Sequence, residues 1–219
     1  MTLALQEDLA VGAVQRRTMT VLIIAQVIGT IGVGVAPTIG VLLAEEVTNS
    51  EAWAGLARAA STLGTALFGL WLGTLAARRG RRVALSCGWW LAAAGSVLLV
   101  IAAQLGLVIP MFVGLMLIGA GSATGLQSRF AATDLADPRQ KARSLALVVW
   151  VGTLGSVLGP NLGAPGEVVG SASGLTMFAS AFLIASVCLA LAGTTVFIWL
   201  RPDPLLLLER AAHVPLSTA

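Results

Sequence analysis

Few residues in this sequence could do chemistry, and those few favour binding over catalysis. Arg58 is a cation early in a long apolar stretch. A charge at such a place predicts a cavity-facing or paired role. The alternative is that its guanidinium reaches the membrane headgroups or Glu51. Gln26 and Thr30 stand four residues apart, so they share one helix face, where they can hydrogen-bond a solute or a neighbouring helix.

The residue types argue against several other kinds of chemistry. The one histidine, His213, lies in the C-terminal tail, so no apolar stretch holds the Ser and His pair of an intramembrane protease. Cys87 and Cys188 have no CxxC or histidine neighbour, so we expect no metal site, no cofactor and no disulfide. No Asp or Glu lies deep in an apolar stretch, so no proton-binding carboxylate is visible. We therefore predict that the chain is not an enzyme.

The composition shows which solvent surrounds these residues. Of the 219 residues, 57% are hydrophobic and 11% are charged, whereas a soluble domain carries about 25% charged residues. The mean hydropathy is +0.92. These polar residues are too few to cover a soluble fold, so lipid must cover most of the outside. The net charge of +3 forms no basic face of a soluble domain, so we expect no nucleic-acid partner.

Runs without charge predict six membrane spans, because a crossing helix needs about 20 apolar residues. The run from Val83 to Ser128 would measure about 70 Å as one helix, so it must fold back, and we place its turn near Gln104–Gly106. Gly170–Gly174 has the composition of a loop. We expect a cytoplasmic segment at 1–17, a tail or central linker at 202–219, and spans at about 18–44, 53–77, 83–103, 106–128, 144–163 and 174–200.

The basic residues test this number of spans independently. Lys and Arg concentrate on the cytoplasmic side of membrane proteins, and six spans place every basic cluster on one side. Five spans would place the two main arginine clusters on opposite sides. We therefore expect a multi-pass protein of the inner membrane, with both termini in the cytoplasm. The residues concerned are Arg16, Arg17, Arg78, Arg79, Arg81, Arg82, Arg129, Arg139, Lys141, Arg143 and Arg201.

A first motif lies between the second and third spans. Residues 73–85 read GTLAARRGRRVAL. This stretch resembles the inner loop of the major facilitator superfamily, G-x-L-a-D-R-x-G-R-[RK]. Ala77 stands where the family has an aspartate, to which the resemblance assigns a gate latch. We expect Arg81 to pair instead with Asp134, and Gly80 to form a tight turn at positive φ. The matching residues include Gly73, Arg78, Gly80, Arg81 and Arg82.

A second motif lies in the fifth span. Residues 152–166 read GTLGSVLGPNLGAPG and resemble the fifth-helix motif of the same superfamily, with Gly155, Gly159, Pro160 and Gly163 at matching positions. Pro160 removes a backbone donor, so it should kink the helix. In the family this motif accompanies export by proton antiport. The alternative is a structural kink with no bearing on direction.

The order of the spans agrees with the resemblance. Six spans divide into two sets of three, and the odd number inverts the second set, as in each half of a major facilitator transporter. We predict an all-α membrane protein that is the N-terminal six-helix half of a drug-efflux-like member. The resemblance places the first and fourth helices along a central cavity, with interhelical hydrogen bonds as the alternative for each residue. The cavity candidates are Gln26, Thr30, Arg58, Ser122, Thr124 and Gln127.

The resemblance implies transport of a small hydrophobic or amphiphilic solute by alternating access, with efflux by proton antiport. Family members have two such halves, so the expected partner is a second six-helix half or a second copy of this chain. The alternative is a truncated, non-transporting membrane protein with a structural or regulatory role. Ala77 and the missing carboxylates favour that alternative.

Overall fold

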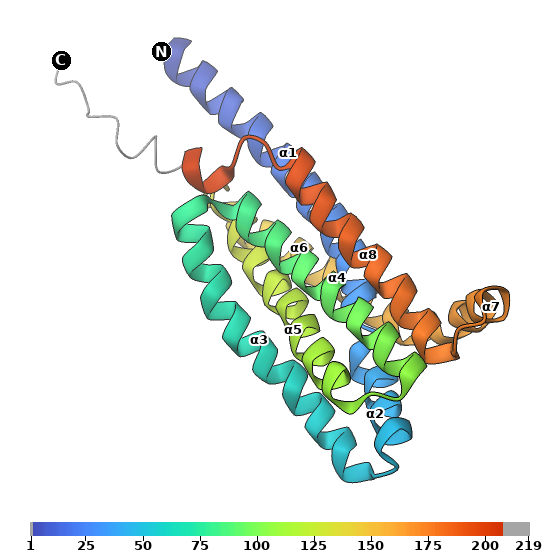
Figure 1. Cartoon of the computed structure of the whole chain (residues 1–219). Coiled ribbons are helices and arrows are strands. Elements are labelled where there is room, and N and C mark those ends of the chain that lie inside the picture. Colours follow the sequence, from blue (N-terminus) through green and yellow to red (C-terminus); the bar gives the residue numbers. More distant parts are fainter. Residues whose placement is uncertain (1, 208–219) are drawn as a thin grey trace.

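The computed structural model of the chain describes residues 2–207, which form the bundle of long helices in Figure 1. No strand occurs among these residues, so the predicted all-α fold class is confirmed. A π-helical turn, η1, interrupts the first span, and a 3₁₀ turn, η2, interrupts the fifth. The elements are α1 Thr2–Val33, η1 Ala36–Gly40, α2 Val41–Thr48, α3 Glu51–Arg79, α4 Arg81–Leu105, α5 Val108–Ala131, α6 Lys141–Leu158, η2 Gly159–Leu162, α7 Gly163–Ser173 and α8 Met177–Trp199.

Within the described residues, six helical stretches are long and apolar enough to cross a membrane, which confirms the predicted number. The first joins α1, η1 and α2, and the fifth joins α6, η2 and α7. The chain is therefore a multi-pass membrane protein whose surroundings are a lipid bilayer. The stretches are Gly12–Thr48, Ala52–Arg79, Arg81–Leu105, Val108–Ala131, Lys141–Ser173 and Met177–Leu207.

Glycines at positive φ mark both ends of α4. Gly80 (φ +86°) alone separates α3 from α4, and Gly106 (φ +64°) follows the last residue of α4. Both turns lie where the sequence predicts them, because only glycine adopts such angles without cost. The 46-residue run therefore folds back as two antiparallel helices, α4 and α5, that lie side by side in Figure 1.

One segment differs from expectation. Gly170–Ser173 belongs to α7 rather than to a loop, and only Gly174–Thr176 connects α7 to α8. The small residues let α7 approach α8 closely, since a Cβ added to Gly166 would lie 3.2 Å from the backbone nitrogen of Ala181. Ser173 Oγ donates to the carbonyl of Val169 (2.6 Å), which satisfies the hydroxyl within the helix. Packing on α8 thus overrides a composition that is poor for a helix.

The neighbour relations of the spans follow the predicted 3+3 repeat. α1 packs on α6 and α8, α5 packs on α3 and α4, and α4 packs on α8. The repeat exchanges α1 with α5, α3 with α6, and α4 with α8. This exchange turns the α1–α6 contact into α5–α3 and the α1–α8 contact into α5–α4, and it leaves α4–α8 unchanged. The same packing scheme therefore recurs in both halves of the bundle.

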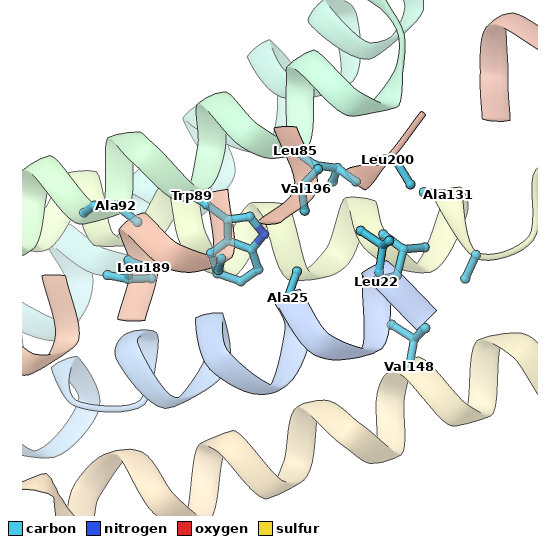
Figure 2. Close-up of a cluster of buried hydrophobic side chains, with 14 residues drawn as sticks. Leu22, Ala25, Leu85, Trp89, Ala92, Ala131, Val148, Leu189, Val196 and Leu200 are labelled. Atoms are coloured by element: carbon cyan, nitrogen blue, oxygen red, sulfur yellow. The ribbon is translucent and has the colours of Figure 1, made fainter. Parts of the chain in front are cut away.

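The centre of the bundle is built around Trp89. This side chain is 1% exposed and projects from α4 towards α1, beside Ala25 and Leu189 (Figure 2). A Cβ on Gly29 of α1 would lie 2.5 Å from the indole ring, so that glycine provides the space the ring occupies. α4 and α8, whose residues line neither of the hollows described below, thus form the packed side of the bundle.

Candidate functional site

Two hollows adjoin each other on one side of the bundle. Pro37, Ser122 and Leu126 line both of them. The first hollow measures about 630 Å³ and lies between α3, η1 and α5. The second measures about 460 Å³ and lies between α1, α5 and α6. Both repeats therefore contribute to the joined space, α1 and α3 from the first and α5 and α6 from the second.

The first hollow receives its polar groups mainly from α3. Arg58, Ser61, Thr62 and Thr65 line it, and three of them follow the spacing i, i+4 and i+7 that shares a helix face. Thr62 Oγ1 donates to the Arg58 carbonyl (3.0 Å), and Thr65 Oγ1 donates to the Ser61 carbonyl (3.0 Å). These hydroxyls are therefore satisfied on their own helix and keep acceptor lone pairs for a solute.

The second hollow contains a buried amide. Gln26 is 5% exposed, and its Oε1 has no hydrogen-bond partner within the described part of the chain. Its Nε2 lies 3.2 Å from where a Cβ would stand on Gly125 and 3.3 Å from where one would stand on Gly152. Two glycines on facing helices, α5 and α6, thus form the notch that holds the amide. Arg129, Thr153 and Ser156 line the same hollow.

Five of the six predicted cavity residues lie at these hollows. Gln26 and Thr30 line the second, Arg58 and Gln127 line the first, and Ser122 lines both. The Thr30 hydroxyl also donates to the Gln26 carbonyl (2.6 Å).

Thr124 is the exception, because it lines neither hollow. It is fully buried, donates to the Ala120 carbonyl (2.7 Å) and packs against Gly88 of α4. Thr124 comes two positions after Ser122 in the helix, which places the two side chains on opposite faces.

The structure also adds residues that the sequence analysis did not select. The α3 hydroxyls could have been found, because Ser61, Thr62 and Thr65 lie on the face of Arg58. From the sequence, Arg129 is only one of the basic residues expected on the cytoplasmic side. In the structure it lies in the last turn of α5 and lines the second hollow. Whether the Arg129 side chain lines this hollow depends on which face of α5 packs against α1 and α6. The spacing of residues along α5 does not reveal that face.

At one end of the bundle, Arg81 joins the α3–α4 turn to the end of α5. Its Nε donates to Asp134 Oδ2 (2.8 Å) and its Nη2 donates to Asp134 Oδ1 (3.3 Å), so the expected pairing is present. Its Nη1 donates to Gln127 Oε1 (3.2 Å). Because Gln127 also lines the first hollow, one side chain connects the hollow to the ion pair. Gly73 packs beside Gln127, and Arg78 is exposed.

A second carboxylate reaches the same turn from the far end of the chain. Asp203 Oδ2 accepts from the backbone N–H of Arg82 (2.8 Å), which caps the start of α4. A Cβ on Gly80 would overlap this carboxylate, so the glycine permits the approach. Arg82 Nε donates to the Phe197 carbonyl (2.8 Å), and its guanidinium lies 4.5 Å from the centre of the Phe197 ring. Ala77 thus leaves the turn with Asp134 and Asp203 as its carboxylates.

The fifth-span motif forms the contact with the first span. Gly155 packs against Thr30, and a Cβ on Gly159 would lie 2.5 Å from the Cα of Gly34. Pro160 lines the second hollow. Gly163 is different, since its neighbour is the end of the Met177 side chain in α8. The two interrupted spans therefore cross where glycines leave both backbones without side chains, beside the second hollow.

A six-span bundle built from two repeated three-helix units, with a hollow between its repeats, defines a transporter-like membrane protein. Residues 20–217 match the sequence profile of the Major Facilitator Superfamily, and the chain belongs to this superfamily. This assignment points to a transporter rather than an enzyme.

Two Bacillus subtilis (strain 168) proteins, both described as uncharacterized MFS-type transporters, are similar to the chain. It is 37% identical over 195 residues to YdeG and 38% identical over 191 residues to YddS. These alignments cover 88% and 87% of this chain but 45% and 44% of the relatives. The chain thus spans about half the length of the curated relatives it matches.

Proposed function

We propose that this chain supplies one six-helix half of an alternating-access transporter, and that the joined hollows are its share of the solute pathway. The observation that carries this proposal is that both repeats line two adjoining hollows, which share Pro37, Ser122 and Leu126. Superfamily membership supports transport as the activity. A truncated, non-transporting protein with a purely structural role would not require an open space between its repeats.

The lining of the hollows supports a hydrophobic or amphiphilic solute. Alanine and leucine side chains make up much of the first surface, valine and proline side chains much of the second, and hydroxyl and amide groups are scattered among them. Apolar walls with a few placed polar groups are typical of small-molecule sites. The size of the space limits the solute to a small molecule.

The exposed spans support a second half as the partner. Only 17% of the most apolar part of the second span and 22% of the fifth are buried, against 44% to 56% in the other four. These two spans, built on α3 and α6, are equivalent in the repeat and flank the hollows. A second six-helix unit, either another chain or a second copy of this one, would cover them and close the pathway.

Direction and orientation complete the proposal. The kinked fifth-span motif supports efflux by proton antiport. No Asp or Glu lines either hollow among the described residues, so the proton-binding carboxylate would belong to the second half. The protein would lie in the inner membrane with both termini in the cytoplasm, because the basic connectors then face inward.

Dye efflux from bacterial cells tests this function. The chain would be expressed alone and together with the part of YdeG that the alignment does not cover, and accumulation of a hydrophobic fluorescent dye measured with and without a protonophore. We expect the pair, and not the chain alone, to lower accumulation until the proton gradient collapses. Ser122→Leu fills the junction of the hollows and should abolish efflux, whereas Thr124→Val, outside both hollows, should not. The alternative of a non-transporting, structural protein is favoured if co-expression does not lower dye accumulation, or if Ser122→Leu and Thr124→Val have the same effect.

A further inference from the structure

We infer that the ligand of the joined hollows is an amphiphilic anion, whose acidic head group binds beside Arg129 and Gln26. This inference rests on the proposed function, because it assigns a chemical class to the solute of that pathway. It starts from the charges that face the space. The lining side chains include two cations, Arg58 and Arg129, and no carboxylate among the described residues. The space is therefore electropositive in a bundle with few charges.

Arg129 differs from Arg81, its neighbour at the same end of the bundle. Arg81 has Asp134 and Gln127 as partners. Arg129 is partly buried, and its Nε is a buried donor without a hydrogen-bond partner among the described residues. A buried N–H without an acceptor is costly, and an anion with hydrogen-bond acceptors offsets that cost. Arg129 lines the second hollow, so a bound solute can supply the anion.

Gln26 provides the second half of the head-group site. Its Oε1 is also buried without a partner, so both residues hold unused hydrogen-bonding capacity in one hollow. Gly125, which forms one wall of the Gln26 notch, lies one helical turn before Arg129 on the same face of α5. The amide offers donors as well as an acceptor, so it can bind a carboxylate or its acidic proton.

The remainder of the space fits a hydrocarbon tail. From the head-group site, Leu126 and Pro37 lead into the first hollow, where Ala57, Ala66 and Leu70 form apolar walls. A ligand with an acidic head and a short apolar tail matches this sequence of surfaces. A cationic head group would meet an arginine in either hollow, Arg58 in the first and Arg129 in the second, and no carboxylate among the described residues.

Three probes built on eight-carbon chains test the charge preference: octanoate, octanol and octyltrimethylammonium. The purified full chain would be studied in phosphatidylcholine nanodiscs, and the midpoint of thermal unfolding followed as each probe is added. A ligand that binds the folded state raises this midpoint. We expect octanoate to raise it at lower concentration than octanol, and the cation to raise it least.

Variants locate the effect. Arg129→Gln should weaken octanoate binding on the order of tenfold, the loss of one charge-assisted contact, and leave octanol binding unchanged. Arg129→Lys keeps the charge and should retain most of the preference. Gln26→Leu should weaken octanoate binding as well and gives a second measurement if Arg129→Gln does not fold. Arg143→Gln is the control, since it removes an exposed arginine at the same end of the bundle that lines neither hollow.

The outcomes separate this inference from the proposed function. The anion assignment is overturned if the cation binds at least as well as octanoate, or if Arg129→Gln and Arg143→Gln give equal effects. In that case dye efflux by the paired halves still supports the pathway. If Gln26→Leu weakens octanoate binding but Arg129→Gln folds and leaves it unchanged, Arg129 does not bind the head group and the anion assignment is overturned. If no probe binds and no pairing transports, both conclusions fall.

Discussion

At the scale of single residues, Arg81 carries the contacts at the end of the bundle where the basic connectors meet. Its side chain is 14% exposed and that of Asp134 is 12% exposed, so solvent screens the pair only in part. Asp134→Asn removes the charge and leaves Arg81 with a neutral partner. We expect a loss of roughly 1–3 kcal/mol in the free energy of unfolding, measured by denaturant titration in detergent.

The matched control for this change is Asp137→Asn. Asp137 is exposed in the same connector, and among the described residues its carboxylate accepts only from the backbone N–H of Arg139. We expect a change within about 0.5 kcal/mol. Equal losses in the two variants would show that the Arg81 pair contributes nothing specific.

The sequence predicts Asp134 as a partner of Arg81, but neither the contact with Gln127 nor the direction in which every polar side chain points. Ser122 and Thr124 are both small hydroxyl residues in one span, and only the helices around them separate their roles. Ser122 meets open space between the repeats, whereas Thr124 fills the gap above Gly88. Arg129 shows the same limit, since a sequence places it near the membrane edge but gives no neighbour.

At the scale of elements, the turns at the two ends of α4 provide a matched pair. Gly80 has φ +86° and ψ +168°, a region that only glycine occupies readily, and it also contacts Asp203. Gly106 has φ +64° and ψ +35°, which other residues tolerate, and no atom lies within 4 Å of its added Cβ. We expect Gly80→Ala to cost about 2–3 kcal/mol and Gly106→Ala about 1 kcal/mol.

Thermal unfolding midpoints in detergent would compare the two variants. A ranking in the opposite order would mean that Asp203 does not hold the end of α8 against α4. Both turns were visible in the sequence, because a glycine between two helical runs has few structural alternatives. The contact with Asp203 was not visible, since the chain returns to this turn only after α8.

The crossing of the first and fifth spans gives a second test at this scale. Gly159→Ala would press a methyl group onto the backbone at Gly34, which cannot move aside. Gly163→Ala in the same motif meets only the flexible end of Met177, 3.0 Å away. We expect the first change to destabilise the fold by about 1–3 kcal/mol and the second by less than about 1 kcal/mol. Denaturant titration measures both, and equal costs would argue against a close crossing.

The fifth span also shows where element prediction ends. The proline and the glycine face were readable, and the helix does change to a 3₁₀ turn at Gly159–Leu162. The composition of Gly170–Gly174 predicts a loop, whereas α7 continues through Ser173. The loop prediction failed because α8 lies close enough to accept such small residues, a tertiary effect that local composition does not contain.

At the scale of the whole molecule, the number of spans and the repeat were predictable because both depend on charge placement and length. The basic clusters recur at intervals that only six crossings place on one side. The neighbour relations then follow the exchange of the two three-helix units. The hollows between the units were not predictable in position, since they depend on how far α3 and α6 stand from α1 and α5.

Orientation in the membrane is the prediction that the whole arrangement depends on. The Arg81–Asp134 pair, 2.8 Å apart, requires the α3–α4 turn and the α5–α6 connector to lie at one end of the bundle. In a background of Cys87→Ala and Cys188→Ala, single cysteines would be placed at exposed Arg79, Arg139 and Ser173. We expect an impermeant maleimide to label Ser173→Cys in intact cells, because that residue precedes the turn at the opposite end.

Arg79→Cys and Arg139→Cys should react only after the membrane is permeabilised, since their arginine-rich surroundings favour the cytoplasmic side. Labelling of both before permeabilisation would show that the protein has the opposite orientation in the membrane with the same fold. Labelling of one without the other would place the partners of a salt bridge on opposite faces of a bilayer whose hydrocarbon core is about 30 Å thick. No arrangement of these helices satisfies that result, so it would contradict the bundle, its hollows and the transport function together.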